Sequence, residues 1–470
     1  MVQLTDAAET APSSDDVTAE ALVARLRTTF ATGRTRDLEW RQSQLAAIES
    51  LIDQREQEIE AALSEDLGRG GFDAYVGDIA STRIEVAHAR KHLKHWTRGH
   101  KVKLPMSMRP GKAEYRYEPL GVVLVVSPWN YPAYLALAPL VGAIAAGNCV
   151  VVKPSEHTPA TSALLARLIP EYLDSDAVAV VEGAADETKA LIDTGLDHIL
   201  FTGGTAIGRA VMEAAAPHLT PVTLELGGKC PVIVTPEANL DVTARRVASS
   251  KLLNAGQTCV APDYVLVDRT VADRFVEALQ AAITEFTRKD EGLARTVVNE
   301  RHAQRLAGLL DGHGGTVVLG GEARPAERSV DMTVIVDPDT DSELMGDEIF
   351  GPILPVIGVD SLDEAIRFVQ ARPKPLAAYL FSDDGDEHER FLTEISAGGS
   401  AVNQVAMHCL VPDLPFGGVG TSGIGAYHGE WGFQTFSHRK SVLRKPTRPD
   451  PKLTYPPYGG WKEKLLRRVL

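Results

Sequence analysis

Apolar residues in the first hundred positions recur at the spacing of amphipathic helices. Leu22 and Leu26 stand about one helical turn apart, and the same period continues towards residue 66. Because an α-helix has about 3.6 residues per turn, this spacing puts the apolar side chains on one face and predicts helices over 18–66. Another amphipathic helix is predicted over 77–96. A break between structural units is predicted at the stretch that follows, LPMSMRPGKAE, which contains Pro, Met and Gly.

From residue 120 the pattern changes to short apolar runs that alternate with helical stretches. Two runs are rich in β-branched residues, as buried strands are: GVVLVVSP and NCVVVKP. The segment between them predicts a helix that ends at Gly147. Strands separated by helices in this way indicate βαβ units and a parallel sheet. A second series of the same kind runs from PVIV to ILPVIGV, so two α/β halves are predicted, with a joint near residues 226–231.

Composition and charge argue against several classes of protein. The chain has 470 residues, of which 44% are hydrophobic, and a formal net charge of −15. A surface this acidic repels phosphate backbones, so nucleic acid is not an expected partner. No apolar run is long enough for a transmembrane helix. Residues 1–17 lack the apolar core of a signal peptide and are predicted to form a short disordered tail.

The four cysteines are too far apart for a disulfide framework or a zinc site. Cys149, Cys230, Cys259 and Cys409 form no CxxC pair and have no His at finger spacing, so no metal is expected. Reduced thiols of this kind fit a cytoplasmic protein. We interpret the basic C-terminal decapeptide, WKEKLLRRVL, as a packed or frayed terminus, with a weak membrane-surface helix as the alternative.

The strongest chemical signal is the segment NAGQTCVAP, residues 254–262. It puts Cys259 between a predicted helix and a predicted strand, and its small neighbours leave the sulfur accessible. A nucleophilic cysteine needs such access, together with nearby dipoles that favour the thiolate. The alternative for a cysteine is a small buried hydrophobe. That description fits Cys149 and Cys230, each of which borders a predicted buried strand.

Two further polar residues stand where predicted buried strands end. Glu225, in TLELGGK, lies in an otherwise apolar strand end, where desolvation would raise its pKa towards that of a useful base. The alternative is a structural ion pair, for instance with Lys229. Asn130, in PWNYP, lies in a loop between Pro128 and Pro132, and an amide on so stiff a backbone suits an oxyanion hole. The alternative is an asparagine that stabilises its own turn.

Three segments are candidates for binding a dinucleotide. The order of strand, glycine turn and helix in FTGGTAIG directs backbone N–H groups at an anion, which predicts a pyrophosphate site. Lys153 and Glu156, in KPSE, follow the carboxyl end of a strand, where they could hold ribose hydroxyls. Glu348 and Phe350, in EIFGP, offer a polar anchor and a ring to a flat ligand. Either of the last two pairs alone is also typical of a surface turn.

A literal GxGxxG occurs at Gly418, Gly420 and Gly423, but its context differs from that of a dinucleotide fingerprint. No strand is predicted before it, and no acidic residue follows at the right distance. We interpret it as a flexible or close-packed loop near a site. The segment FTGGTAIG also departs from the fingerprint, because Thr205 occupies the place of the second glycine.

Taken together, these segments resemble the aldehyde dehydrogenase superfamily. The motifs occur in the family's order and with its spacings, and the resemblance covers roughly residues 20–455: PWNYP, KPSE, FTGGTAIG, LELGGK, GQTC, EIFGP and LPFGG. Longer segments resemble more narrowly the branch with a short N-terminus, which holds the class 3 and the fatty and aromatic aldehyde enzymes: LTPVTLELGGK, GQTCVAPDY, RPKPLAAY, LPFGGVGTSG and YHGEWGFQTFSHRKS.

The resemblance implies a role for each candidate residue. Cys259 would be the nucleophile and Glu225 the general base, while Asn130 and the backbone N–H of Cys259 would form the oxyanion hole. The cofactor would be held at the adenosine ribose by Lys153 and Glu156, at the pyrophosphate by Gly203, Gly204, Thr205 and Gly208, and at the nicotinamide end by Glu348 and Phe350. Relatives often carry Ser or Asn at position 204, so glycine there removes a possible donor to the phosphate.

The fold implied by the resemblance is α/β, with three parts. A Rossmann-like NAD(P)-binding domain would comprise residues 18–103 and 120–226, and an α/β catalytic domain would follow over 227–435. Residues 104–119 and 436–455 would form a small β bridging element. In this family that element completes a sheet of a partner subunit, so a homodimer is the expected assembly.

The activity implied is the NAD(P)-dependent oxidation of aldehydes to carboxylic acids, through a thiohemiacetal and a thioester. NAD is the expected cofactor, since Glu156 should repel a 2′-phosphate, but Lys153 would tolerate one and leaves NADP open. The branch implies medium- or long-chain aliphatic or aromatic aldehydes as substrates. One alternative is a CoA-acylating dehydrogenase, against which Glu225 argues. The other is a catalytically silent structural relative, against which the intact set of site residues argues.

Overall fold

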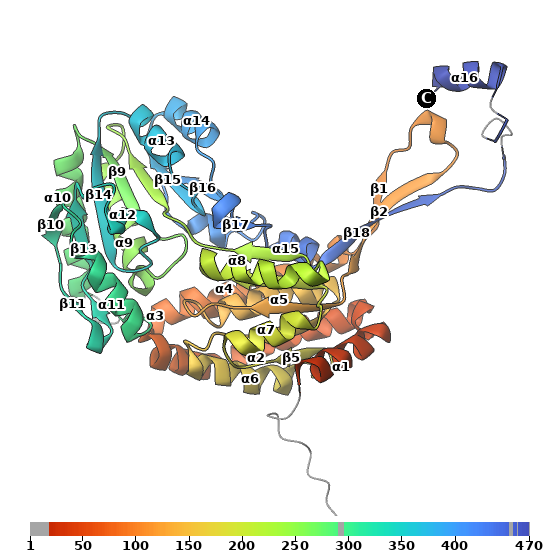
Figure 1. Ribbon diagram of the computed structural model, residues 1–470, viewed down its shortest axis with the longest axis horizontal. Coiled ribbons are helices and arrows are strands. Elements are labelled where there is room, and N and C mark those ends of the chain that lie inside the picture. The colour runs from red at the N-terminus through yellow and green to blue at the C-terminus, as the bar shows by residue number, and fades with distance from the viewer. Residues whose placement is uncertain (1–17, 290–295, 451–454, 458, 470) are drawn as a thin grey trace, which may run out of the picture.

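The computed structural model describes residues 18–289, 296–450, 455–457 and 459–469. Two mostly parallel sheets with their helices form the body, and a narrow antiparallel sheet projects from it as an arm (Figure 1). The predicted disordered tail, residues 1–17, lies outside the described residues. The predicted division into two α/β halves corresponds to the two large sheets, while the domain boundaries given above stay predictions.

The first sheet has the strand order β17–β7–β6–β3–β4–β5, with β17 (Gly423–Ile424) antiparallel at the edge. Its parallel strands are β3 (Val122–Val126), β4 (Cys149–Lys153), β5 (Val178–Val180), β6 (His198–Thr202) and β7 (Val222–Glu225). Every residue of β3 and β4 is buried. Helices on both faces of the sheet leave no face for water, which is why these strands read as continuous apolar runs.

The helices of this half confirm the predicted amphipathic segments, with one difference. Residues Tyr75–Ala80 form a wider π turn, so the helix predicted over 77–96 begins at Ser81. Gly147 ends its predicted helix with a φ of 94°, a left-handed conformation that favours glycine. The helices are α1 (Ala19–Ala31), α2 (Leu38–Leu67), α3 (Gly71–Ala74), α4 (Ser81–Trp96), α5 (Tyr134–Ala146), α6 (Pro159–Tyr172), α7 (Ala185–Asp193), α8 (Thr205–Ala215) and α15 (Gly429–Thr435).

The second sheet has the strand order β10–β13–β14–β9–β8–β15–β16, with β10 antiparallel at one edge. The strands are β8 (Pro231–Val234), β9 (Tyr264–Asp268), β10 (Thr316–Leu319), β13 (Thr333–Val336), β14 (Ile353–Val359), β15 (Ala377–Phe381) and β16 (Gly399–Val402). A short hairpin lies beside it, formed by β11 (Ala323–Arg324) and β12 (Ser329–Val330). The helices are α9 (Leu240–Leu252), α10 (Ala272–Lys289), α11 (Glu300–Leu309), α12 (Glu343–Gly346), α13 (Leu362–Gln370) and α14 (Gly385–Glu394).

The arm is a three-stranded antiparallel sheet built from segments far apart in the sequence. β2 (Lys112–Pro119) is its central strand and pairs with β1 (His100–Val102) and with β18 (Ser437–Arg444). The C-terminal decapeptide contributes α16 (Trp461–Val469), which Figure 1 shows at the tip of the arm. The indole of Trp461 is largely exposed there.

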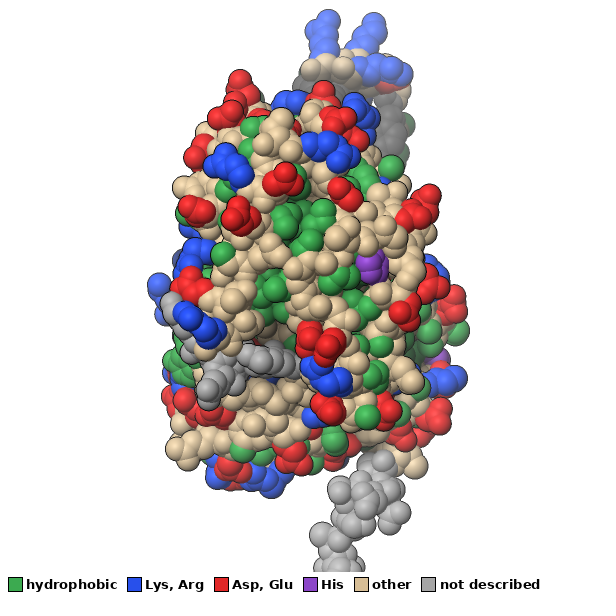
Figure 2. Space-filling view, turned by 90° about the vertical axis from the view of Figure 1, so that its left-hand side faces the viewer, with side chains coloured by type: hydrophobic (Ala, Val, Ile, Leu, Met, Phe, Trp, Pro, Cys, Tyr) green, Lys and Arg blue, Asp and Glu red, His purple; other side chains and the backbone are tan. Residues whose placement is uncertain are grey.

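The surface carries charges of both signs. Figure 2 shows acidic and basic side chains interspersed on the face next to α10 and α11. Among the described residues, no helix combines the length and the apolar character needed to span a bilayer.

Asn148 joins three parts of the first half at a fully buried position. Its Oδ1 accepts the N–H of Gly121, at the start of β3, at 3.0 Å. Its Nδ2 donates to the carbonyl of Ala143, in α5, at 3.2 Å and to that of Phe436, where the chain enters β18, at 2.9 Å. One side chain therefore ties the sheet, a covering helix and the root of the arm together.

We predict that Asn148→Ala destabilises the protein without changing its chemistry. The substitution leaves the N–H of Gly121 and the carbonyl of Phe436 without this partner, and each buried polar group left unpaired costs roughly 1–3 kcal/mol. Urea unfolding should show a free energy of unfolding lower by about 2–4 kcal/mol, with catalytic rates per folded molecule unchanged. An unaltered unfolding midpoint would contradict this account of Asn148.

Candidate active site

One cavity of about 1710 Å³ lies between the carboxyl ends of the parallel strands of the first sheet and the segments that precede β8, β9, β14 and β15 of the second sheet. The predicted site residues that line it are Asn130, Lys153, Glu156, Gly203, Gly204, Thr205, Glu225, Cys259, Glu348 and Phe350. Gly208 does not line the cavity. It lies on the inner side of α8, where a Cβ would stand 2.5 Å from Leu226 Cδ2, so it allows the helix to pack closely on β7.

Cys259 lies between α9 and β9, as predicted, on a loop with an unusual backbone. Asn254, Ala255 and Gly256 all have positive φ values, of 49°, 52° and 72°. A Cβ on Gly256 would lie 2.4 Å from the carbonyl oxygen of Gly351, so only glycine fits there. This left-handed turn ends α9 sharply and presents the half-buried thiol of Cys259 to the cavity.

Gln257 fixes the conformation of the Cys259 loop, a role that the sequence did not suggest. Its side chain is fully buried, and its Nε2 donates to the carbonyls of Asn254 and Thr296, each at 3.0 Å. Its Oε1 accepts the N–H of Val298 at 2.9 Å. All the polar atoms of this amide are thus engaged. A Gln two residues before a candidate nucleophile is the only signal in the sequence that could have pointed to it.

Glu225 ends β7 with its carboxyl group buried and unpaired. Its side chain is 2% exposed, and neither oxygen has a hydrogen-bond partner among the described residues. Burial therefore raises the pKa of Glu225 well above its ordinary value. The alternative of an ion pair with Lys229 is wrong, because Lys229 Nζ lies 2.5 Å from Asp263 Oδ2 instead.

The literal GxGxxG segment is a close-packed loop beside Glu225, as interpreted above. Gly423 pairs with Glu225 in the β17–β7 ladder, and the carbonyl of Ser422 accepts the N–H of Leu226 at 3.1 Å. A Cβ on Gly418 would lie 2.0 Å from the oxygen of Ser422. These glycines therefore allow two backbones to come into contact, and the contact holds the end of the strand that carries Glu225.

Asn130 is anchored across the cavity rather than within its own turn. Its side chain is 3% exposed, and its Nδ2 donates to the carbonyl of Gln257 at 3.1 Å. This bond spans the two halves and is unlike an Asx turn, the alternative considered above. An amide nitrogen has two N–H bonds, so one is used for the anchor and the second is left for a ligand.

The glycine turn between β6 and α8 has the form of an anion site. Gly204 precedes the first turn of α8, and a Cβ there would meet no atom within 4 Å, so the space over the helix N-terminus is open. On the same cavity, two strands away in the sheet, Lys153 Nζ lies 3.1 Å from Glu156 Oε2. Lys153 itself is almost fully buried, while Glu156 is half-exposed. A cavity lined by an open helix N-terminus and a buried cation suits a dinucleotide's phosphates and ribose.

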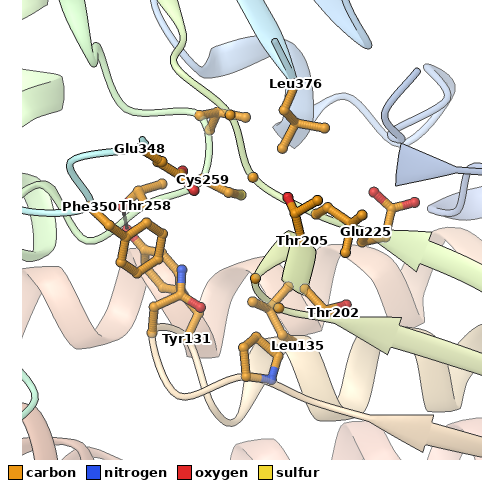
Figure 3. A pocket seen from close by; sticks show the side chains of 18 of the residues that line it. Tyr131, Leu135, Thr202, Thr205, Glu225, Thr258, Cys259, Glu348, Phe350 and Leu376 are labelled. Carbon is orange, nitrogen blue, oxygen red and sulfur yellow. Dashed lines mark hydrogen bonds between the residues drawn. The ribbon is translucent and has the colours of Figure 1, made fainter. Parts of the chain in front are cut away.

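Glu348 and Phe350 lie on the opposite side of the cavity from the glycine turn. Figure 3 shows both near Cys259, with Glu225 and Thr205 across from them. Burial and the neighbouring Asp263 raise the pKa of Glu348 to about 8. A Cβ on Gly227 would lie 1.8 Å from Glu348 Oε2, so the glycine makes room for the carboxyl group.

The thiol of Cys259 is neutral in this environment. Burial is the main cause, and it raises the pKa of the Cys259 thiol well above the usual value. Neighbouring groups that carry negative charge when ionised raise this pKa further: Glu348, Cys409, Cys230 and Glu225. The thiolate is the reactive form of cysteine, so the site has to supply positive charge or remove a proton before attack.

The sequence and the structure both match known enzymes. The model of the aldehyde dehydrogenase family matches residues 5–442. The chain belongs to the aldehyde dehydrogenase family. It is 45% identical over 459 residues to aldehyde dehydrogenase family 3 member H1 of Arabidopsis thaliana, with 96% of this chain and 95% of the relative covered. This agrees with the predicted class 3 branch.

Two further relatives extend the comparison. The dimeric, NADP-preferring aldehyde dehydrogenase of Canis lupus familiaris is 43% identical over 441 residues, with 93% of the enzyme and 97% of the relative covered. The substrate-bound structure of Staphylococcus aureus AldH superimposes with a TM-score of 0.93 at 42% identity, and covers 96% and 98% of the two chains. The enzyme is thus an NAD(P)-dependent aldehyde dehydrogenase with the α/β fold of its family.

We predict that Glu225→Gln stabilises the fold, and by more at about pH 8 than at about pH 5. The pKa of Glu225 is raised in the folded enzyme. The unfolded chain therefore releases this proton more readily, and the folded state loses relative stability as the pH rises above the unfolded pKa. Gln does not titrate and removes this loss. Thermal-unfolding midpoints at the two pH values measure the effect, and an equal shift at both would contradict it.

Proposed function

We propose that the enzyme oxidises aldehydes through a covalent thioester on Cys259. The observation that carries this assignment is a thiol and an unpaired buried carboxyl group, Glu225, on one cavity that also holds an anion-binding glycine turn. The overall reaction converts an aldehyde, NAD(P)⁺ and water to a carboxylic acid, NAD(P)H and a proton. In the first step the Cys259 thiol loses its proton, which is the proton released in the overall reaction. The sulfur then bonds to the aldehyde carbon while the carbonyl π electrons move to the oxygen, which gives a tetrahedral thiohemiacetal oxyanion.

The oxyanion of that intermediate needs hydrogen-bond donors in fixed positions. The free N–H of the Asn130 amide is one such donor, because the other N–H is held by the carbonyl of Gln257. The backbone N–H of Cys259 is the second donor in the proposed site. Donors of this kind act most strongly in a cavity from which water is excluded.

The cavity residues that carry no role in the attack on the aldehyde fit the cofactor. The adenosine ribose would be held by Lys153 and Glu156. The pyrophosphate would be held by the turn at Gly203, Gly204 and Thr205. The nicotinamide end would contact Glu348 and Phe350. When bound, the nicotinamide accepts the hydride that leaves the thiohemiacetal. NAD is the proposed preference, since the Glu156 carboxylate beside the ribose repels a 2′-phosphate, whereas Lys153 allows NADP to bind.

Glu225 is the proposed general base for release of the product. Burial raises the pKa of Glu225, so its carboxylate form is a stronger base than an exposed carboxylate. Once ionised, it takes a proton from a water molecule, and the resulting hydroxide attacks the thioester carbonyl. The sulfur of Cys259 leaves as a thiolate and takes up the proton held by Glu225, and the carboxylic acid is released. A water-consuming second step distinguishes this enzyme from one that transfers the acyl group to CoA.

The substrates we propose are medium- or long-chain aliphatic or aromatic aldehydes. Apolar and aromatic side chains line the cavity beyond Cys259, among them Tyr134, Leu135, Phe416 and Tyr427. Walls of this kind bind a hydrocarbon chain or ring by removing its surface from water, at about 25 cal/mol per Å².

The assembly and location belong to the same proposal. A homodimer is supported by the exposed arm of β1, β2 and β18, a sheet with two open edges that a second copy could cover. A cytoplasmic location is supported by the four cysteines, all of which are free thiols.

Replacing Cys259 with Ser should abolish NAD(P)H formation, because a neutral hydroxyl is a far weaker nucleophile than a thiolate. The absorbance of NAD(P)H during aldehyde turnover measures it. Cys149→Ala, which removes a buried thiol outside the cavity, is the matched control and should keep its activity. Undiminished turnover by Cys259→Ser would rule out the thioester.

A panel of aldehydes assayed with each cofactor tests the substrate assignment. We expect kcat/KM to rise with chain length and to be higher for aromatic aldehydes than for acetaldehyde, with NAD preferred over NADP. CoA added to the assay should not be consumed. Turnover that depends on CoA, or a preference for short polar aldehydes, would contradict the proposal.

A further inference from the structure

Arg69 lies in the interior behind the Asn130 loop, and the mechanism proposed above does not use it. It follows α2 in the turn that leads to α3, and its side chain is fully buried. A buried guanidinium is costly unless its charge is paired and its donors are engaged. The partners of Arg69 therefore indicate which part of the fold depends on this charge.

The guanidinium contacts the Asn130 loop at two points. Its Nη1 donates to the carbonyl oxygen of Asn130 at 3.0 Å. Its Cζ lies over the ring of Tyr131, 4.5 Å from the centroid. A planar cation on an aromatic face, together with a hydrogen bond to the preceding carbonyl, fixes both the position and the tilt of this peptide. Lys has no planar fork and cannot reproduce both contacts.

Two carboxylates hold the guanidinium in this place. Asp78 Oδ2 lies 2.9 Å from Nη1 of Arg69, and Asp73 Oδ1 lies 3.4 Å from its Nε. The other oxygen of Asp78 accepts the N–H groups of Ala133 and Tyr134, at 3.0 and 2.9 Å. Asp78 therefore binds the arginine and the far end of the same loop, so the ion pair and the loop form one unit.

The backbone next to this unit is shaped for close approach. Gly77 and Asp78 belong to the π turn Tyr75–Ala80, and such turns are rare and frequent at functional sites. A Cβ on Gly77 would lie 2.1 Å from Nη2 of Arg69 and 2.8 Å from the ring of Tyr131. The missing side chain of Gly77 is what allows the guanidinium and the ring to meet.

The Asn130 carbonyl also connects Arg69 to the loop of the nucleophile. Asn254 Nδ2 donates to the same oxygen at 2.8 Å and to the carbonyl of Gln257 at 3.2 Å. Arg69 and Asn254 thus share one acceptor, the first from the α2–α3 turn and the second from the Cys259 loop. A shift of this carbonyl changes the relation between the two loops.

We infer that Arg69 is a positioning residue for the oxyanion hole, which sets where the Asn130 amide stands relative to the Cys259 thiol. The inference rests on the proposed function, in which Asn130 donates to the oxyanion. Such a donor is effective only close to its correct place, and a misplacement of ~1 Å can cost about a hundredfold in rate. Arg69 touches no reacting atom and acts through the Asn130 loop.

The first test is Arg69→Lys, which keeps a positive charge beside Asp73 and Asp78 but loses the planar contacts. We expect kcat for the hydride-transfer step, followed as the pre-steady-state formation of NAD(P)H, to fall about ten- to a hundredfold. The KM for the aldehyde and the dissociation constant of the cofactor should change by less than about twofold.

Arg41→Lys is the matched control. Arg41 is also a buried arginine, and its guanidinium donates to three backbone carbonyls, but it does not line the cavity. This variant should lower the thermal-unfolding midpoint and leave kcat unchanged. Equal losses of stability in the two variants, with no loss of kcat in Arg69→Lys, would show that Arg69 is only structural.

A second variant guards against misfolding. Arg69→Met alone would leave the Asp78 carboxylate buried without a compensating charge, which is strongly destabilising. Arg69→Met combined with Asp78→Asn removes both charges and keeps an oxygen at position 78 for the two loop N–H groups. We expect this folded double variant to show the same selective loss of kcat. Full kcat in it would overturn the inference.

A double-mutant cycle with Asn130→Ala identifies the path of the effect. Asn130→Ala should lower kcat by roughly 10²–10³. Adding Arg69→Lys to it should change kcat by less than about twofold, because residues that act through one another are not additive. Full additivity would mean that Arg69 does not act through Asn130. If Asn130→Ala leaves kcat unchanged, the proposed oxyanion hole is wrong. If Asn130→Ala lowers kcat and Arg69→Lys does not, only the role of Arg69 is overturned.

Discussion

The site depends on a buried, hydrogen-bonded contact between two loops that belong to different sheets. Asn130 follows β3 of the first sheet, Gln257 precedes β9 of the second, and the 3.1 Å bond from Nδ2 to the carbonyl of Gln257 joins them. A second bond, from Asn254 Nδ2 to the carbonyl of Asn130 at 2.8 Å, joins the same two loops, so the amide and the thiol are held in one relation. Because both loops are buried, this bond is made in a medium of low dielectric constant, where it is stronger than in water and costly to break.

Burial also determines the charge of the site. The carboxyl groups of Glu225 and Glu348 and the thiol of Cys259 lie close together in a largely apolar cavity, and burial raises the pKa of each. In the enzyme alone, the neutral forms of these groups are favoured, so three like charges do not have to be accommodated. Charge then develops only as the reaction proceeds, next to fixed donors that stabilise it. The burial of the Glu225 carboxyl group lowers the stability of the folded enzyme, and the proposed chemistry requires that burial.

The sequence predicts the residues at strand ends well and the contacts between distant loops poorly. Glu225 and Asn130 stand at the carboxyl ends of parallel strands of one sheet, so their arrival at one edge follows from the order of the strands. Cys259 precedes β9 of the other sheet, and no local pattern shows that the two sheets meet there. The hydrogen bond from Arg69 to the carbonyl of Asn130 joins residues that are 61 positions apart, and no sequence motif near either residue predicts it. It depends on the π turn at Gly77, which interrupts the predicted helix and which helical periodicity does not show.

Two predictions were refined by packing. The resemblance to the family implied Gly208 at the pyrophosphate, but the phase of α8 turns it towards Leu226. Glu225 could have paired with Lys229, but Asp263 arrives from the second half of the chain and takes that partner. The most direct test mixes the Glu225→Gln enzyme with aldehyde and NAD. It follows the NADH formed and then measures the mass of the peptide that carries Cys259. The account predicts a burst of about one NADH per subunit and an acyl group on the peptide that carries Cys259. Steady turnover without a burst, or an unmodified Cys259, would contradict it.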